Sequence, residues 1–139
     1  MNLEEFCKII DGSVCYKSAD FSMPCRASGS MFDVVTDSRD VKKGCIFVCL
    51  KGEFHDGHDY VRQAAEDGAG IIIVNEDKKA DVMKAIDDAR AMNTSVISVK
   101  APLYAMGEIV PVVFTYYIQA MAFTVDAFVC GAAVGKAHV

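Results

Sequence analysis

The sequence predicts an α/β fold in which a mixed, partly parallel sheet is flanked by helices. Three apolar segments, at 45–50, 71–74 and 95–99, have the length and composition of buried strands. The segments that follow the first two, 58–67 and 78–92, carry apolar residues at helical spacing. Strands that alternate with helices are typical of a sheet that is at least partly parallel.

The composition is that of a folded globular domain. The chain has 139 residues, of which 53% are hydrophobic and 24% are charged, enough for a sizeable core. Its net charge of −5 and the lack of a basic stripe argue against nucleic acid as a partner. Six cysteines without a C-x-x-C pair, and no signal peptide, predict free thiols in the cytoplasm rather than a disulfide framework.

The first 35 residues predict a helix, a short strand and a second strand. Apolar residues share one face of the helix expected at 3–10, namely Leu3, Phe6, Cys7 and Ile10. Asp11-Gly12 ends that helix. The stretch 13–30 is rich in Ser, Cys and Gly, which predicts a short strand and an irregular connection, and 31–35 is a candidate strand.

The middle of the chain predicts a strand–loop–helix–strand unit. The strand at 45–50 leads into a polar loop, 51–57, that holds glycines at 52 and 57. A short helix at 58–67 stops at Gly68, and the strand at 71–74 follows. In such units a ligand usually binds at the loop that follows the carboxyl end of a strand.

The last 39 residues are harder to interpret. A helix fits residues 103–109, and Pro111 is expected to interrupt it. Residues 109–125 carry no charge and approach transmembrane length, which begins at about 17 residues. Because this run contains a proline, two threonines and a glutamine, a buried helix plus strand is favoured over a membrane span.

Several short motifs between residues 36 and 76 follow one another in an order that resembles a known family. The motifs are Asp37-Ser38-Arg39, Gly44, Phe47-Val48, Lys51-Gly52, Asp56-Gly57-His58 and Gly68-Ala69. They resemble the N-terminal, UDP-sugar-binding domain of the Mur ligases, ATP-dependent enzymes that add amino acids to UDP-N-acetylmuramoyl precursors of bacterial peptidoglycan. The resemblance is good over residues 1–100 and poor over 101–137.

Within the family, the resemblance favours one ligase type over another. The opening residues and Val134-Gly135-Lys136 look more like the ligase that adds D-alanyl-D-alanine. Phe47-Val48-Cys49 also suits the ligase that adds the third residue, which comes second. The implied organisation is a substrate-binding domain at 1–100 and an apolar helix and strand tail at 101–139.

The resemblance implies a set of residues that bind the UDP part of a UDP-N-acetylmuramoyl-peptide. The set is Thr36, Ser38, Arg39, Lys51, Glu53, Phe54 and His55. Each also has a plainer interpretation. Thr36 and Ser38 can cap a turn, and Arg39 can pair with Asp37 instead of a diphosphate. Lys51 can be an ordinary surface lysine, and His55 a solvated loop histidine.

Asp56 and His58 invite other functional readings. Asp56 is most simply the cap of the helix that follows. A catalytic Asp–His pair would need a nucleophile, and the sequence contains no G-x-S-x-G motif. His55 and His58 alone make a weak zinc motif, so no metal site is expected.

Residues 128–137 look like a degenerate phosphate loop. Gly135 and Lys136 match G-x-x-x-x-G-K-[ST], but Ala137 stands at the hydroxyl position. ATP and magnesium are therefore implied only for a full-length family member, and we expect no complete ligase activity from this chain. The alternative is a non-catalytic remnant that no longer binds the nucleotide sugar and pairs with a protein partner, or with itself, through residues 109–134.

Overall fold

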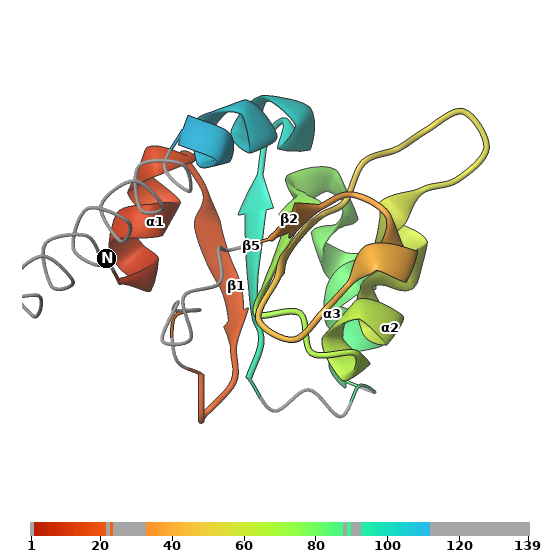
Figure 1. Ribbon diagram of the computed structural model, residues 1–139, viewed down its shortest axis with the longest axis horizontal. Coiled ribbons are helices and arrows are strands. Elements are labelled where there is room, and N and C mark those ends of the chain that lie inside the picture. Colours follow the sequence, from red (N-terminus) through yellow and green to blue (C-terminus); the bar gives the residue numbers. More distant parts are fainter. Residues whose placement is uncertain (1, 22, 24–32, 88, 90–92, 112–139) are drawn as a thin grey trace, which may run out of the picture.

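The computed structural model describes residues 2–21, 23, 33–87, 89 and 93–111. Its elements, shown in Figure 1, follow one another as α1 (Leu3–Ile9), β1 (Ser13–Lys17), β2 (Val34–Val35), η1 (Ser38–Asp40), β3 (Ile46–Val48), η2 (Gly57–Tyr60), α2 (Val61–Glu66), β4 (Ile71–Asn75), η3 (Glu76–Lys78), α3 (Lys79–Asp87) and β5 (Ser95–Val99). Elements η1 to η3 are short 3₁₀ helices. Residues 102–111 form a further helical segment.

The strands form one mixed sheet in the order β1-β5-β4-β3-β2. Strands β2, β3, β4 and β5 are parallel, and β1 lies antiparallel to β5 at one edge. The predicted α/β class with a partly parallel sheet is confirmed. Because the parallel strands point the same way, the loops that follow β2, β3 and β4 all leave the sheet at the same edge.

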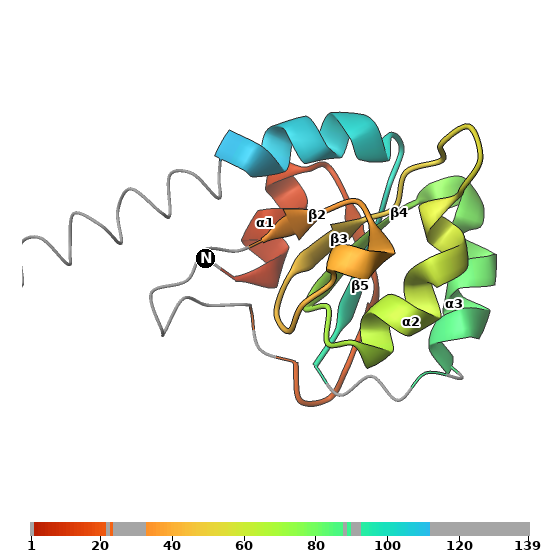
Figure 2. The same ribbon diagram turned by 45° about the vertical axis from the view of Figure 1, so that its right-hand side comes forward.

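Side chains that alternate along the strands build a core on each face of the sheet. On one face, Ile46, Ile71 and Ile97 pack with Phe6 of α1 and with Ile109 of the segment 102–111. On the other face, alternate strand residues such as Phe47 and Ile72 pack with α2 and α3. Figures 1 and 2 show α2 beside α3, and α1 beside the segment 102–111. Burial on both faces explains why these strands read as continuous apolar runs.

The elements predicted within the described residues are present, with some changes at their ends. The strand expected at 31–35 is seen as β2, and residues 31 and 32 lie outside the described part. The helix expected at 58–67 is divided, because η2 precedes α2, and the strand expected at 45–50 narrows to β3. The helix expected at 78–92 begins with η3 and continues as α3. Residues 88 and 90–92, which belonged to that prediction, lie outside the described part of the chain.

The segment 102–111 corrects one expectation. It is helical through Pro111, which does not end the helix ahead of itself as the sequence suggested. Within the described residues, no helix has both the length and the apolar character needed to cross a membrane. The uncharged run after residue 111 and the phosphate-loop remnant at Gly135 and Lys136 lie outside the described residues.

Candidate functional site

The candidate site lies at the edge of the sheet where β2, β3 and β4 end. Each strand is followed by a short 3₁₀ helix that begins with an Asp or Asn cap. The side chain of Asp37 accepts a hydrogen bond from the Arg39 amide, that of Asp56 from the His58 amide, and that of Asn75 from the Asp77 amide. After β2 and β4 these caps turn the chain close to the strand end, whereas after β3 the loop 51–55 precedes the cap.

The turn after β2 is held by an ion pair between neighbours in the sequence. The Arg39 guanidinium contacts both carboxylate oxygens of Asp37, with Nη2 at 2.6 Å from Oδ2 and Nε at 3.0 Å from Oδ1. These hydrogen bonds lower the pKa of Asp37 to about 2. Of the two roles considered for Arg39, the structure shows the clasp with Asp37. The Arg39 side chain is nevertheless 86% exposed and keeps outward-facing N–H groups for a ligand.

The loop after β3 folds into a small hairpin. Lys51 and Asp56 pair across its base, and the Gly52 amide donates to the His55 carbonyl at 2.7 Å. The Gly57 amide donates to the Leu50 carbonyl at 2.9 Å and returns the chain to the end of β3. A side chain at Gly57 would meet the backbone of Cys49 and Leu50 at 3.0 Å, so this close return requires a glycine.

A pocket of about 490 Å³ lies between the turn and the hairpin. It is lined by Thr36, Asp37, Ser38, Arg39, Leu50, Gly52, His55, Gly57 and Tyr60. Two segments well separated in the sequence therefore share one hollow. Its volume falls within the usual range for small-molecule sites, roughly 300–1,000 Å³. Its lining combines hydroxyls, glycine backbone and one guanidinium.

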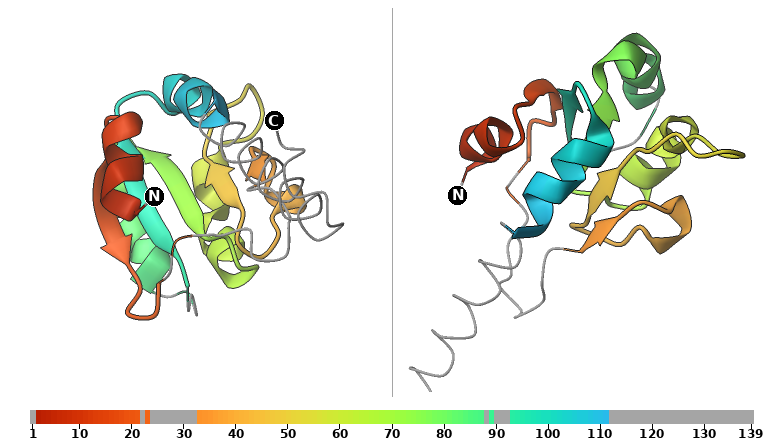
Figure 3. Two further views of the ribbon diagram at one scale, coloured as in Figure 1. Left: turned by 60° about the vertical axis from the view of Figure 1, so that its left-hand side comes forward. Right: turned by 90° about the horizontal axis from the view of Figure 1, so that it is seen from above.

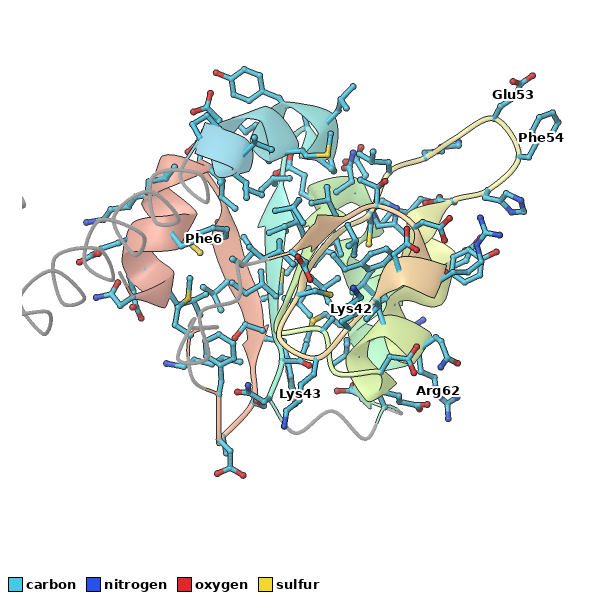
Figure 4. All side chains as sticks on the ribbon, in the orientation of Figure 1. Phe6, Lys42, Lys43, Glu53, Phe54 and Arg62 are labelled. Carbon is cyan, nitrogen blue, oxygen red and sulfur yellow. The ribbon has the colours of Figure 1, made fainter. Side chains whose placement is uncertain are left out.

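The structure brings together four of the seven residues predicted to bind a ligand. Thr36, Ser38, Arg39 and His55 line the pocket. The other three, Lys51, Glu53 and Phe54, are not among its lining residues. Glu53 and Phe54 stand at the tip of the hairpin, which projects from the body of the domain in Figures 3 and 4, and Phe54 is 84% exposed. A role in binding remains a prediction for all seven.

Sequence reasoning missed Tyr60 as a lining residue. Tyr60 ends η2 and lines this pocket together with an adjoining hollow of about 740 Å³ between η1 and α2. The sequence did contain a signal for this position. Tyr60 is an aromatic residue two positions after Asp-Gly-His, in the first turn of the predicted helix. Ser38 and Arg39 also line both hollows, so these three residues form the wall between them.

Asp56 and His58 lie behind the hairpin and contact the end of β4. The Nδ1 atom of His58 is 2.6 Å from Oδ1 of Asp56, and its Nε2 atom accepts a hydrogen bond of 2.9 Å from the Asn75 amide. The capping role predicted for Asp56 is confirmed. Both ring nitrogens of His58 already have partners, which disfavours the catalytic reading of the pair. Across the described residues, no cluster of three or more His, Cys, Asp or Glu side chains could hold a metal ion.

The region that carries this pocket is similar to a known protein family. Residues 33–110, more than half of the chain, match the model of the family described as "Mur ligase family, catalytic domain". The matched region begins just before β2 and therefore includes the turn, the hairpin and the parallel part of the sheet.

Individual relatives match over shorter stretches. The chain is 59% identical over 46 residues, 33% of its length, to the UDP-N-acetylmuramoyl-L-alanyl-D-glutamate–2,6-diaminopimelate ligase of Bacillus licheniformis. It is 44% identical over 62 residues, 45% of its length, to the ligase of the same name from Bacillus velezensis. It is 43% identical over 53 residues, 38% of its length, to the UDP-N-acetylmuramoyl-tripeptide–D-alanyl-D-alanine ligase of Escherichia coli. These matches cover 9–13% of the relatives' own lengths.

Proposed function

This chain belongs to the Mur ligase family, and from that premise we propose that its pocket binds the uridine diphosphate part of a UDP-N-acetylmuramoyl-peptide. The observation that carries the proposal is the meeting of residues 36–39 with residues 50–57 around one pocket. The names of the relatives all describe ligases of UDP-N-acetylmuramoyl substrates. Binding by this particular region is our inference.

The chemistry of the pocket suits a nucleoside diphosphate. A uracil ring offers one N–H donor and two carbonyl acceptors, and the hydroxyls of Thr36 and Ser38 can both donate and accept. The exposed guanidinium of Arg39 can contact a diphosphate while Asp37 fixes its direction. At Gly52 the lining carries no side chain, so a ligand can come close to the backbone.

We further propose that the ligase type is the one that adds diaminopimelate, ahead of the one that adds D-alanyl-D-alanine. This reverses the order that the sequence favoured. The support is that both Bacillus relatives named above carry the diaminopimelate-adding name. Peptide preference, ATP and magnesium belong to the activity of the whole enzyme. We derive no catalytic step from the described residues, and cytoplasmic location stays a prediction.

The proposal is tested by calorimetric titration with UDP and UDP-N-acetylmuramate, with ADP as the control nucleotide. We expect Kd values below 1 mM for the uridine ligands, which is about −4 kcal/mol or tighter, and weaker binding of ADP. Ser38→Ala should weaken uridine binding roughly 3- to 10-fold, the effect of one lost hydrogen bond. Ser13→Ala, on the exposed surface of β1, is the matched control.

Two results would overturn the proposal: no binding of either uridine ligand at millimolar concentration, or equal binding of ADP. The first would favour the second candidate, a non-catalytic interaction protein, and the second would mean that the pocket does not recognise uracil. This second candidate is supported by the outward face of the helical segment 102–111, where Leu103, Tyr104 and Val110 are exposed. Most of the stretch first predicted for such pairing, 109–134, lies outside the described residues.

A further inference from the structure

The imidazole of His58 joins two strand ends behind the pocket. Its side chain is 7% exposed, and it lies between Asp56, at the end of the hairpin, and the backbone of Asn75, at the end of β4. Asp56 also pairs with Lys51 across the base of the hairpin. The ring therefore connects β4 to the hairpin that supplies Gly52 and His55 to the pocket.

The two hydrogen bonds allow only one form of the neutral ring. The Asn75 amide can only donate, so Nε2 of His58 must present its lone pair and carry no proton. The ring proton is then on Nδ1 and is donated to Asp56 Oδ1 at 2.6 Å. A ring that gained a second proton would keep its contact with Asp56, but it would turn a second N–H toward the Asn75 N–H.

The groups around Asp56 keep its carboxylate ionised, as the acceptor of the Nδ1 proton of His58. Burial works to raise the pKa of Asp56, but the hydrogen bonds from His58 and the nearby Lys78 outweigh it and lower the pKa. The Lys78 Nζ atom lies 4.0 Å from Oδ2 of Asp56, whereas His58 contacts Oδ1. Cys49, a further titratable neighbour of Asp56, is buried, and burial raises the pKa of its thiol, so it stays neutral. Asp56 is therefore a stable anionic acceptor for the ring.

We propose that His58, in its neutral form with the proton on Nδ1, is the positioning residue of the pocket, and that a second proton on its ring loosens the hairpin and weakens the ligand. The identity of the ligand in this inference rests on the proposed function. The positioning role of His58 rests on its hydrogen bonds. The hydrogen bond on which the mechanism depends is the one of 2.9 Å from the backbone N–H of Asn75 to Nε2 of His58. It is the only one of the two hydrogen bonds that protonation of the ring removes.

Two substitutions separate the two bonds. In His58→Gln the amide oxygen can occupy the place of Nε2 and accept from Asn75 without titrating, while the donor to Asp56 is lost. In His58→Asn the shorter side chain can still reach Asp56, while the acceptor for Asn75 is lost. Comparison of the pair identifies the bond that positions the hairpin.

The ligand readout is the affinity for UDP-N-acetylmuramate as a function of pH. It is measured in a His55→Gln background, because a second imidazole, that of His55, lines the pocket. With His58 intact, we expect affinity to be about tenfold weaker at acidic pH, where the ring carries a second proton, than at neutral pH, the effect of one lost hydrogen bond at the upper end of the usual range. With His58→Gln added, the affinity should not change with pH. An equal fall in both proteins contradicts the proposal.

A second readout needs no ligand, so it separates this proposal from the proposed function. Long-range ¹H–¹⁵N NMR of the wild-type protein should show the Nδ1–H form at neutral pH. In His58→Asn, the amides of Asn75 and Gly52 should exchange with solvent about tenfold faster, whereas His58→Gln should keep the Asn75 amide protected. If the ring is in the Nε2–H form, or Gly52 exchange is the same in all three proteins, the positioning role is wrong. If these tests succeed and no uridine ligand binds, only the proposed function fails.

Discussion

At the scale of the residue, short-range pairs fix the backbone on which the candidate site depends. Asp37 and Arg39 are two positions apart, and their pairing holds the turn after β2. The sequence raised this pairing as one of two roles for Arg39 and could not decide between them. The deciding factor is geometric, because a 3₁₀ turn places the guanidinium beside the carboxylate two residues earlier.

The clasp predicts a measurable shift in the titration of Asp37. The pKa of Asp37 is lowered to about 2 because Arg39 donates to its charged form. In Arg39→Gln, the pKa should rise toward its ordinary value of about 3.9. Because the pKa is lower in the folded than in the unfolded protein, the ionised carboxylate stabilises the folded state at pH values above the unfolded-state pKa. This contribution is lost as the pH falls through the folded-state pKa of about 2. The shift is read from the ¹³C signal of the Asp37 carboxyl.

Arg62→Gln is the control for this titration. It breaks the pair of Arg62 with Glu66 on α2 and leaves the Asp37 clasp intact. An Asp37 titration that is the same in wild type and Arg39→Gln would show that the clasp does not persist in solution. Because both partners are exposed, the overall stability of the protein should change little.

At the scale of the element, the sequence predicted the strands better than the helix starts. The strands β4 and β5 could be predicted because burial on both faces requires uninterrupted apolar runs. A turn at 36–39 and a helix from about residue 78 were expected, but the 3₁₀ form of η1 and η3 was not, because their Asp and Asn caps act through local hydrogen bonds that leave no periodic pattern. The hairpin was predicted only as a polar loop, because its pairing depends on backbone contacts between Lys51 and Asp56.

Replacement of glycine by alanine should change the free energy of unfolding in opposite directions at two positions. Gly57→Ala would place a methyl group 3.0 Å from backbone atoms of Cys49 and Leu50, which cannot move without shifting the end of β3. It should lower the free energy of unfolding by about 1–3 kcal/mol. Gly107→Ala, at an exposed position of the helical segment 102–111, meets nothing within 4 Å and should raise the free energy of unfolding by about 0.5–1 kcal/mol.

Urea denaturation of both variants beside the wild type measures these differences. If Gly57→Ala is as stable as the wild type, the close return of the chain at the base of the hairpin is incorrect. If Gly107→Ala is destabilised instead, the added methyl group contacts atoms other than those described around Gly107.

At the scale of the whole molecule, topology assembles the candidate site from distant segments. Strands β2 and β3 are parallel neighbours, so the turn at 36–39 and the hairpin at 51–56 leave the sheet side by side. The strand–loop–helix–strand pattern predicted a ligand site at the loop after β3, and the family resemblance added the turn at 36–39 to it. The sequence could not predict that Tyr60 lines the pocket or that Phe54 projects away from it, because those positions depend on how η2 and the hairpin turn after leaving the sheet.

The two cores on either face of one sheet predict a single unfolding transition. Strands β3, β4 and β5 contribute alternate residues to both cores, so neither core can open without disturbing the other. Cysteines report on each face: Cys7 belongs to the core beneath α1, and Cys49 to the core beneath α2 and α3. Burial raises the pKa of the Cys7 thiol to about 11 and raises that of Cys49 further, so both should be inert in the native protein.

Pulsed thiol labelling across a denaturant series, mapped by peptide mass, measures the exposure of each cysteine. Cys7 and Cys49 should become reactive at the same denaturant concentration, as all-or-none unfolding of a small domain requires. Cys15, which is only half-buried on the edge strand β1, should react at lower concentrations and serves as the internal control. Earlier labelling of Cys7 than of Cys49 would mean that α1 leaves the sheet first. The pocket side of the domain would then keep its fold without α1, and the turn and the hairpin would depend only on the core that α2 and α3 cover.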